Sequence, residues 1–241
     1  MPVEDTTPLV RADLDTLVYE RVRQMILDGA LPPGEQIIQD QLARRLGVSR
    51  TPLRRALTQL AKDNLVEMTP RGTFVRQFTL DEVIAVFEIR GVLEGLACRL
   101  FAERAEPPDI AYMRSLFTTA MERITPDHWS AYRQADQEFH YYIAKKSNSS
   151  IISQTLSSFH ILTISFLQGL IRPPEETFPE HMRIIDALEE RDPDKAERYA
   201  VEHIRITVQL LKEGRMAGAL SRFGIRSPSP GGRSAASTSA P

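Results

Sequence analysis

One short stretch, residues 39–76, restricts the possible fold more than any other part of the chain. It begins with an apolar pattern that predicts a short helix, and Gly47 ends this helix. Ser49 is a suitable N-cap for a second helix, which extends to about residue 64. Two β-like segments follow, and the Pro-Arg-Gly sequence between them is typical of a hairpin turn. Together these elements predict a winged helix-turn-helix.

The second of these helices has the chemistry of a DNA-recognition helix. Its apolar stripe faces a core, and its N-terminal end, which usually meets base edges in the major groove, carries Arg50. An arginine can donate two hydrogen bonds to the edge of a guanine. Such a pair favours guanine over other bases by ~1–3 kcal/mol of binding free energy. The candidate DNA-binding residues are Ser49, Arg50, Thr51, Arg54 and Arg55 in the helix and Arg71, Gly72 and Thr73 in the hairpin. For any single arginine, the alternative is a solvated helix face.

The rest of the chain predicts helices and no convincing strand. Six amphipathic runs are separated by proline-rich and polar punctuation, near residues 80–105, 108–123, 127–145, 149–171, 176–191 and 194–216. We therefore expect a mainly α protein, with a winged helix-turn-helix domain over residues 9–76 and a linker over 77–79. An all-α bundle of about six helices should occupy residues 80–218. Residues 219–241 are rich in Ser, Ala, Gly and Pro, which predicts a disordered tail.

The charge is divided between the two halves. Residues 9–78 contain 11 Lys and Arg against 8 Asp and Glu, whereas residues 79–221 contain 16 against 22. A basic module is thus joined to an acidic one, and the net charge of -2 argues against a uniformly basic nucleic-acid coat. No apolar stretch is long enough to span a bilayer, and the single cysteine, Cys98, cannot form an internal disulfide. We expect a cytoplasmic protein without a membrane partner.

Three of the five histidines can act together with one aspartate. Asp136 and His140 are four residues apart, so they share one face of a predicted helix. His181 and His203 are each 11 residues from Asp192, so an antiparallel helical hairpin turning there would bring them level. One carboxylate and three imidazoles suit Zn, Ni, Mn or Fe, and the sequence does not choose among these metals. The alternative is that each histidine is an ordinary core or surface residue.

The N-terminal module resembles a known family. Residues 31–75 look like the N-terminal domain of GntR-type bacterial transcription regulators, and LGVSRTPLRRAL is the most specific part. The all-α half looks like the effector domain of the FadR branch, so that the resemblance covers roughly residues 12–216. It implies a homodimer that binds a short palindromic operator and usually represses transcription. Four positions match motif residues that contact DNA: Arg50, Thr51, Arg54 and Gly72.

The resemblance also bears on the metal ligands and on the DNA contacts. Many FadR-branch domains bind metal through an Asp-x-x-x-His pair and two later histidines, a pattern that this chain matches completely. One departure lies just before Leu42. Many relatives carry Glu and Arg where this chain has Gln39 and Asp40, so a DNA-contacting arginine is absent there. This difference leaves room for a different operator preference.

Arg90 is a candidate for binding a small organic acid effector. It matches a frequent arginine in the first effector-domain helix of relatives, and a planar guanidinium can clamp a carboxylate at two points. Metal coordination positions left open by four protein ligands could also take such a carboxylate. The alternative for Arg90 is a salt bridge with Glu94, one helical turn along.

These features favour a DNA-binding transcription regulator, expected to be a repressor, whose helical domain binds a divalent metal and a carboxylate effector. Two other functions stay open. The metal site could belong to a metalloenzyme, although the chain lacks HExxH, GxSxG and P-loop motifs. Alternatively, the metal itself could be the signal, without an organic effector.

Overall fold

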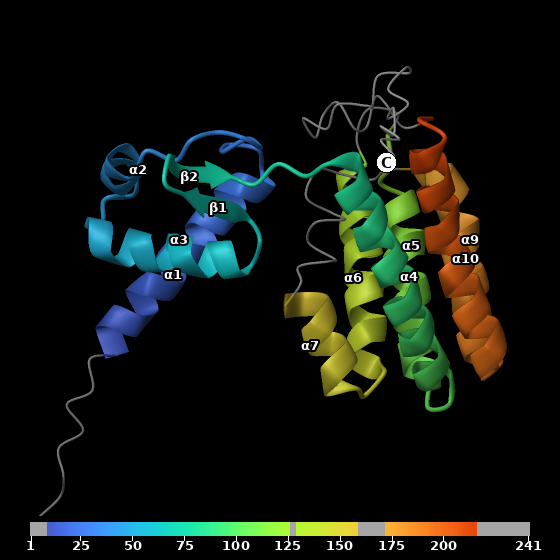
Figure 1. Cartoon of the computed structure of the whole chain (residues 1–241). Coiled ribbons are helices and arrows are strands. Elements are labelled where there is room, and N and C mark those ends of the chain that lie inside the picture. The colour runs from blue at the N-terminus through green and yellow to red at the C-terminus, as the bar shows by residue number, and fades with distance from the viewer. Residues whose placement is uncertain (1–8, 126–128, 159–171, 216–241) are drawn as a thin grey trace, which may run out of the picture.

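A computed structural model of the chain describes residues 9–125, 129–158 and 172–215. Within these ranges the elements form a small N-terminal part with a hairpin and a larger bundle of helices (Figure 1). The mainly helical prediction, with a winged helix-turn-helix followed by a helical bundle, is confirmed. The later part of the helix predicted near 149–171 and the predicted tail at 219–241 lie outside the described residues.

The N-terminal part consists of three helices and a two-stranded hairpin. Its elements are α1 (Leu9–Leu27), α2 (Gln39–Leu46), α3 (Arg50–Lys62), β1 (Val66–Thr69) and β2 (Gly72–Val75). The strands are antiparallel, with Val66 opposite Val75. The apolar stripe of α3 packs against α1, where Leu53, Leu57 and Val22 are completely buried.

Two glycines allow the tight turns of this part. Gly47 follows α2 in the left-handed conformation, with φ 67°, and its N–H caps the last helical carbonyls. Gly72 begins β2 with φ 139°, a conformation that other residues rarely adopt. A Cβ atom at Gly72 would lie 2.7 Å from Nε2 of Gln36, so the hairpin turn is tight against the segment before α2.

The bundle contains the remaining described helices. They are α4 (Leu80–Ala102), α5 (Pro107–Met121), α6 (Ser130–Lys146), α7 (Ser150–Ser158), α9 (Pro174–Glu189) and α10 (Pro193–Lys212). They enclose an apolar core in which Phe101, Phe117 and Phe139 are almost fully buried. No helix in the described ranges is both long enough and apolar enough to cross a membrane.

Helices α4 and α10 pack closely along their length (Figure 1). Glycines on α4 permit the close approach, because Gly91 faces Ile204 and Gly95 faces Val201 of α10. At its start, α4 is fixed by a capping box. The Thr79 side chain accepts from the backbone N–H of Glu82, and the Glu82 carboxylate accepts from the backbone N–H of Thr79. Helix α4 is therefore held at its N-terminus and along its packed face.

Candidate metal centre and nucleic-acid interface

The four predicted metal ligands converge inside the bundle. Asp136 and His140 lie on one face of α6, while His181 comes from α9 and His203 from α10. All four side chains are buried, and one potential ligand atom from each lies within 4.8 Å of the others. Opposite ligands about 2.1 Å from a metal are ~4.2 Å apart, so the group is close to the required size. This buried cluster could hold a metal ion.

Hydrogen-bond partners orient the three imidazoles. The Nδ1 atoms of His140 and His203 each lie 2.7 Å from a glutamate oxygen, contributed by Glu94 and Glu180 respectively. Nδ1 of His181 lies 3.1 Å from the hydroxyl of Tyr132. A carboxylate can only accept, so His140 and His203 carry their proton on Nδ1 and keep the Nε2 lone pair for a metal.

Each glutamate is in turn held by an arginine. Arg172 donates to both carboxylate oxygens of Glu180, at 2.8 and 2.6 Å. Nε of Arg90 donates to Oε1 of Glu94 at 2.6 Å. All four of these side chains are buried. Two Arg–Glu–His chains therefore lead to the cluster from different sides.

The environment keeps the carboxylates charged and two of the imidazoles neutral. Burial would raise the pKa of Asp136, but the neighbouring imidazoles of His181 and His140 hold it well below its usual range. Burial, together with the nearby His203, lowers the pKa of His181 to about 3. Burial also lowers the pKa of His203, although its contact with Glu180 opposes this effect. Neutral imidazoles beside an ionised carboxylate are the protonation states that metal binding requires.

One atom of the cluster has an unsatisfied position that a metal would fill. Nε2 of His181 is fully buried and has no hydrogen-bond partner within the described part of the chain. Oδ1 of Asp136 lies 3.2 Å from it, but without the geometry of a hydrogen bond. Buried polar nitrogens without partners are costly, so this arrangement fits a cation better than it fits ordinary core histidines.

Several residues of this site were not predicted as members. Glu180 directly precedes His181 in the sequence, Arg172 lies nine residues before it, and Tyr132 lies four residues before Asp136. Glu94 was considered only as a partner of Arg90, and the structure contains that salt bridge. Arg90 is nevertheless connected to the cluster, because Glu94, to which its Nε donates, also contacts Nδ1 of His140.

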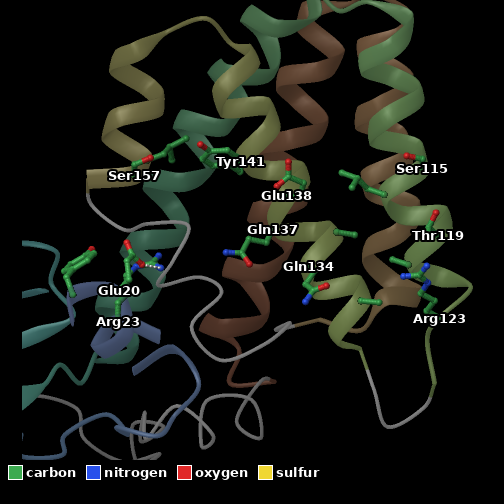
Figure 2. A pocket seen from close by; sticks show the side chains of 16 residues that line it. Glu20, Arg23, Ser115, Thr119, Arg123, Gln134, Gln137, Glu138, Tyr141 and Ser157 are labelled. Atoms are coloured by element: carbon green, nitrogen blue, oxygen red, sulfur yellow. Dashed lines mark ion pairs between the residues drawn. The ribbon is translucent and has the colours of Figure 1, made fainter. Parts of the chain in front are cut away.

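A separate cavity of about 950 Å³ lies between α1 and the bundle. Figure 2 shows Glu20 and Arg23 of α1 on one side and Gln137 and Tyr141 of α6 on another. None of the four cluster residues lines this cavity. An occupant would therefore not touch a metal held by the cluster.

The predicted DNA-binding side chains of α3 lie at its exposed N-terminal half. This group, Ser49, Arg50, Thr51, Arg54 and Arg55, is exposed to solvent. Ser49 is the N-cap by position, but its hydroxyl forms no capping hydrogen bond. Nη1 of Arg55 donates to Asp15 of α1 at 2.8 Å, so this arginine is directed towards α1.

Arg50 is paired with Asp40 across the helix-turn-helix. Nε and Nη2 of Arg50 both contact the carboxylate of Asp40, which lies in the first turn of α2. The sequence marked Asp40 as a departure from the family but did not predict this pair. A signal was nevertheless present, since Asp40 replaces a DNA-contacting arginine of many relatives with a carboxylate, which can pair with the matching Arg50.

The hairpin presents only part of its predicted surface. Arg71 is exposed and Gly72 partly exposed at the tip, whereas Thr73 is buried. The Thr73 hydroxyl accepts from Nε2 of Gln39 at 3.4 Å, which connects the hairpin with the start of α2. In this conformation Thr73 orders the hairpin and does not face solvent.

Both halves of the chain match known protein families. Residues 14–75 match the model for bacterial regulatory proteins of the gntR family, and residues 85–206 match the FCD domain. The chain belongs to the GntR family of bacterial transcription regulators. Its FCD domain places it in the FadR branch.

Transcription regulators from several bacteria match this chain over most of their length. YdhC of Bacillus subtilis (strain 168), an uncharacterized HTH-type transcriptional regulator, is 27% identical over 202 residues, which cover 80% of this chain and 89% of YdhC. A probable D-xylose utilization operon transcriptional repressor of Paenarthrobacter nicotinovorans is 27% identical, covering 81% and 88%. The repressor RspR of Escherichia coli (strain K12) is 23% identical, covering 78% and 84%. These relatives are regulators and not enzymes, which disfavours the metalloenzyme alternative.

Solved structures of other bacterial proteins share the fold. McbR/YncC of E. coli superposes with a TM-score of 0.66 at 22% identity, covering 84% of this chain and 98% of that one. A GntR regulator from Rhodococcus sp. RHA1 gives a TM-score of 0.61 at 23% identity, covering 86% and 97%.

Proposed function

We propose that this GntR-family regulator is a repressor that recognises a palindromic operator and is controlled by a small carboxylate bound at a metal in its FCD domain. The exposed N-terminal half of α3 carries the first part of this proposal. Arg50 and Arg54 are presented there to solvent, and Arg71 stands at the tip of the hairpin. The names of two relatives, the xylose-operon regulator and RspR, support repression.

For DNA binding, α3 would enter the major groove with its N-terminal arginines towards the base edges. Ser49 and Thr51 have hydroxyls suited to phosphate oxygens, and Arg71 would contact the backbone beside the groove. Arg55 would contribute after exchanging its pairing with Asp15 for a phosphate.

For the effector, the charge of the buried site supports an anionic ligand. Three carboxylates (Asp136, Glu94 and Glu180) and two guanidinium groups leave one excess negative charge when the histidines are neutral. A divalent cation held by Asp136 and the three histidines would reverse this to one excess positive charge. A carboxylate at an open coordination position would then neutralise the site, and burial strongly favours such neutralisation. Arg90, whose Nε donates to Glu94, would orient this carboxylate.

A chain of contacts connects the DNA-binding part with the buried cluster, and it supports control of DNA binding by the effector. Arg76, which follows β2, donates to Asn64 and to Glu82 in the first turn of α4, each at 2.6 Å. The same helix carries Arg90 and Glu94 beside His140. A ligand that moves α4 would therefore move the attachment of the hairpin. By linkage, an effector that weakens DNA binding must be weakened by DNA in return.

A second copy of the chain would supply the second DNA-binding module that a palindromic operator requires. Helix α4 exposes a stripe of apolar residues, Ile89 (49%), Val92 (69%) and Leu96 (39%), on the side away from the core. Their spacing of three and four residues keeps them on one face of the helix. A palindromic operator requires two related DNA-binding modules, so we place the homodimer contact on this stripe.

In vitro selection of duplex DNA by the full-length protein tests operator recognition. The wild type should enrich one palindromic sequence, and Arg54→Ala should lose its binding by at least a hundredfold. Arg21→Ala, which removes an exposed charge from α1, should bind nearly normally. Equal binding by the wild type and Arg54→Ala would contradict the assignment of the recognition helix.

The effector is tested with the selected operator and metal-loaded protein. A panel of small mono- and dicarboxylates should contain a compound that lowers operator affinity, and Arg90→Ala should lose this response. An operator affinity that follows the metal concentration alone, with no response to any carboxylate, would instead identify a metal-responsive regulator.

A further inference from the structure

The contact between Asp40 and Arg50 has no role in the proposed function so far, although it lies on the DNA-facing side of the helix-turn-helix. We propose that Asp40 is a specificity-determining residue, which holds Arg50 in position to read a guanine and disfavours other DNA. This inference rests on the proposed role of α3 in operator recognition.

The geometry of the contact leaves the base-reading edge of Arg50 available. The Asp40 carboxylate contacts Nε and Nη2, which form one edge of the planar guanidinium. The other edge lies between Nη1 and Nη2, and it keeps one N–H of each nitrogen for a second acceptor. That edge carries the two parallel donors that match O6 and N7 of guanine. Asp40 can thus orient the side chain without blocking it.

The exposure of the pair argues against a purely structural role. The side chain of Arg50 is 72% exposed and that of Asp40 is 44% exposed. Ion pairs with this exposure contribute little to folding stability. A long arginine side chain held in one geometry before binding, however, loses less conformational freedom when it meets its base.

The charge of Asp40 also acts against unspecific binding. The family resemblance places a DNA-contacting arginine at this position in many relatives, whereas this chain has a carboxylate. A negative charge near the phosphates lowers affinity for every sequence, since backbone attraction supplies most unspecific binding. Where Arg50 finds its guanine, the positioned contact offsets this loss. The difference between correct and incorrect DNA therefore increases.

Competitive DNA selection with full-length variants tests the inference. Arg50→Ala should first identify the operator position that depends on Arg50, as the position at which a guanine preference disappears. Asp40→Asn keeps the shape of the side chain but removes its charge. It should reduce the guanine preference at that position about tenfold and leave other positions unchanged. It should also raise affinity for a duplex of random sequence about threefold.

Three controls separate positioning from other effects. Asp28→Asn removes the same charge from an exposed position after α1 and should leave the base preference unchanged. In an Arg50→Ala background, Asp40→Asn should no longer change any base preference. Thermal melting should show that Asp40→Asn is as stable as the wild type, which excludes unfolding as the cause.

Three negative results would reject different parts of the proposals. If the wild type selects no sequence, both the proposed function and this inference fail. If it selects an operator but Arg50→Ala changes no position, Arg50 reads no base and the inference is wrong. If Asp40→Asn keeps the full guanine preference at the position that depends on Arg50, operator recognition stands and only the role of Asp40 is rejected.

Discussion

Oε2 of Glu180 lies 2.7 Å from Nδ1 of His203, and the same carboxylate accepts two hydrogen bonds from Arg172. This contact determines which nitrogen of His203 faces the cluster. Replacing Glu180 by Gln should lower metal affinity by about 10–100-fold, because outer-shell partners orient ligands and increase their basicity. Competition with a chelating dye would measure this loss.

The matched control is Glu176→Gln on the same helix. Glu176 also contacts Arg172, at 3.4 Å, but it is half exposed. Its substitution should leave metal affinity nearly unchanged. Equal affinities for Glu180→Gln and Glu176→Gln would show that His203 needs no carboxylate partner.

The buried histidines predict a pH dependence for the metal-free protein. The pKa of His181 is about 3 in the folded state, compared with an ordinary value of 6.5. Between these values the unfolded chain binds a proton that the folded protein does not, so stability falls as pH falls below about 6.5. Urea unfolding of chelator-treated protein should give a lower free energy of unfolding at pH 5.5 than at pH 7.5.

A variant distinguishes this histidine effect from general acid denaturation. His181→Phe cannot titrate and retains an aromatic ring next to Phe117, on which the imidazole stacks at 4.3 Å between ring centroids. Its stability should change less between pH 7.5 and 5.5. The lowered pKa of Asp136 contributes only at lower pH, below the ordinary range of carboxylates. An identical pH profile for this variant would exclude His181 as the source.

The packing of α4 against α10 predicts opposite effects for two neighbouring glycines. A Cβ atom at Gly95 would lie 2.5 Å from Cγ2 of Val201, and a β-branched side chain in a helix has one strongly preferred rotamer. Gly95→Ala should therefore destabilise the protein by about 1–3 kcal/mol through overpacking.

Gly91→Ala serves as the comparison on the same helix. Its Cβ atom would meet Ile204 at 3.4 Å, which is nearly ordinary contact. Since alanine favours helices over glycine by about 1 kcal/mol, this variant should be neutral or slightly more stable. Thermal unfolding of both variants tests the difference, and a destabilised Gly91→Ala beside a normal Gly95→Ala would contradict the packing.

The apolar stripe on α4 predicts the oligomeric state. Val92 is the most exposed of its three residues, at 69%. Val92→Glu should shift the protein from dimer to monomer in sedimentation experiments without loss of its helical content. Glu88→Gln, an exposed change one turn away, should leave the dimer intact. A dimeric Val92→Glu variant would place the contact elsewhere.

The ligand set was predictable because helical spacing and one turn determine it. Asp136 and His140 share a helix face at four-residue spacing, and the N-cap at Asp192 fixes where α9 and α10 reverse direction. The partners of the ligands were not predictable in this way. Glu94 and Glu180 are charged residues on amphipathic helices, and only the rotation and crossing of those helices direct them inward.

In the DNA-binding part, too, the elements could be predicted from the sequence but some side-chain contacts could not. Gly47, Ser49 and the hairpin turn mark their elements through local conformational preferences, so the winged helix-turn-helix follows from the sequence. The pairing of Asp40 with Arg50 depends on the angle between α2 and α3. The burial of Thr73 depends on how the hairpin packs against the start of α2. Residue spacing does not determine either of these.

Because Arg76 donates a hydrogen bond to Glu82 in the first turn of α4, a rotation of α4 would displace the segment that follows the hairpin. Glu82 and Glu94 are 12 residues apart on one continuous helix, which corresponds to about 18 Å at 1.5 Å per residue. If α4 pivots near Glu94 by 10°, the end at Glu82 moves by about 3 Å. Such a displacement is small beside the ~34 Å repeat of DNA, but in a symmetric pair it occurs twice and in opposite directions. In the proposed homodimer, a modest change at a bound metal would thus alter the distance between the two α3 helices by several ångströms.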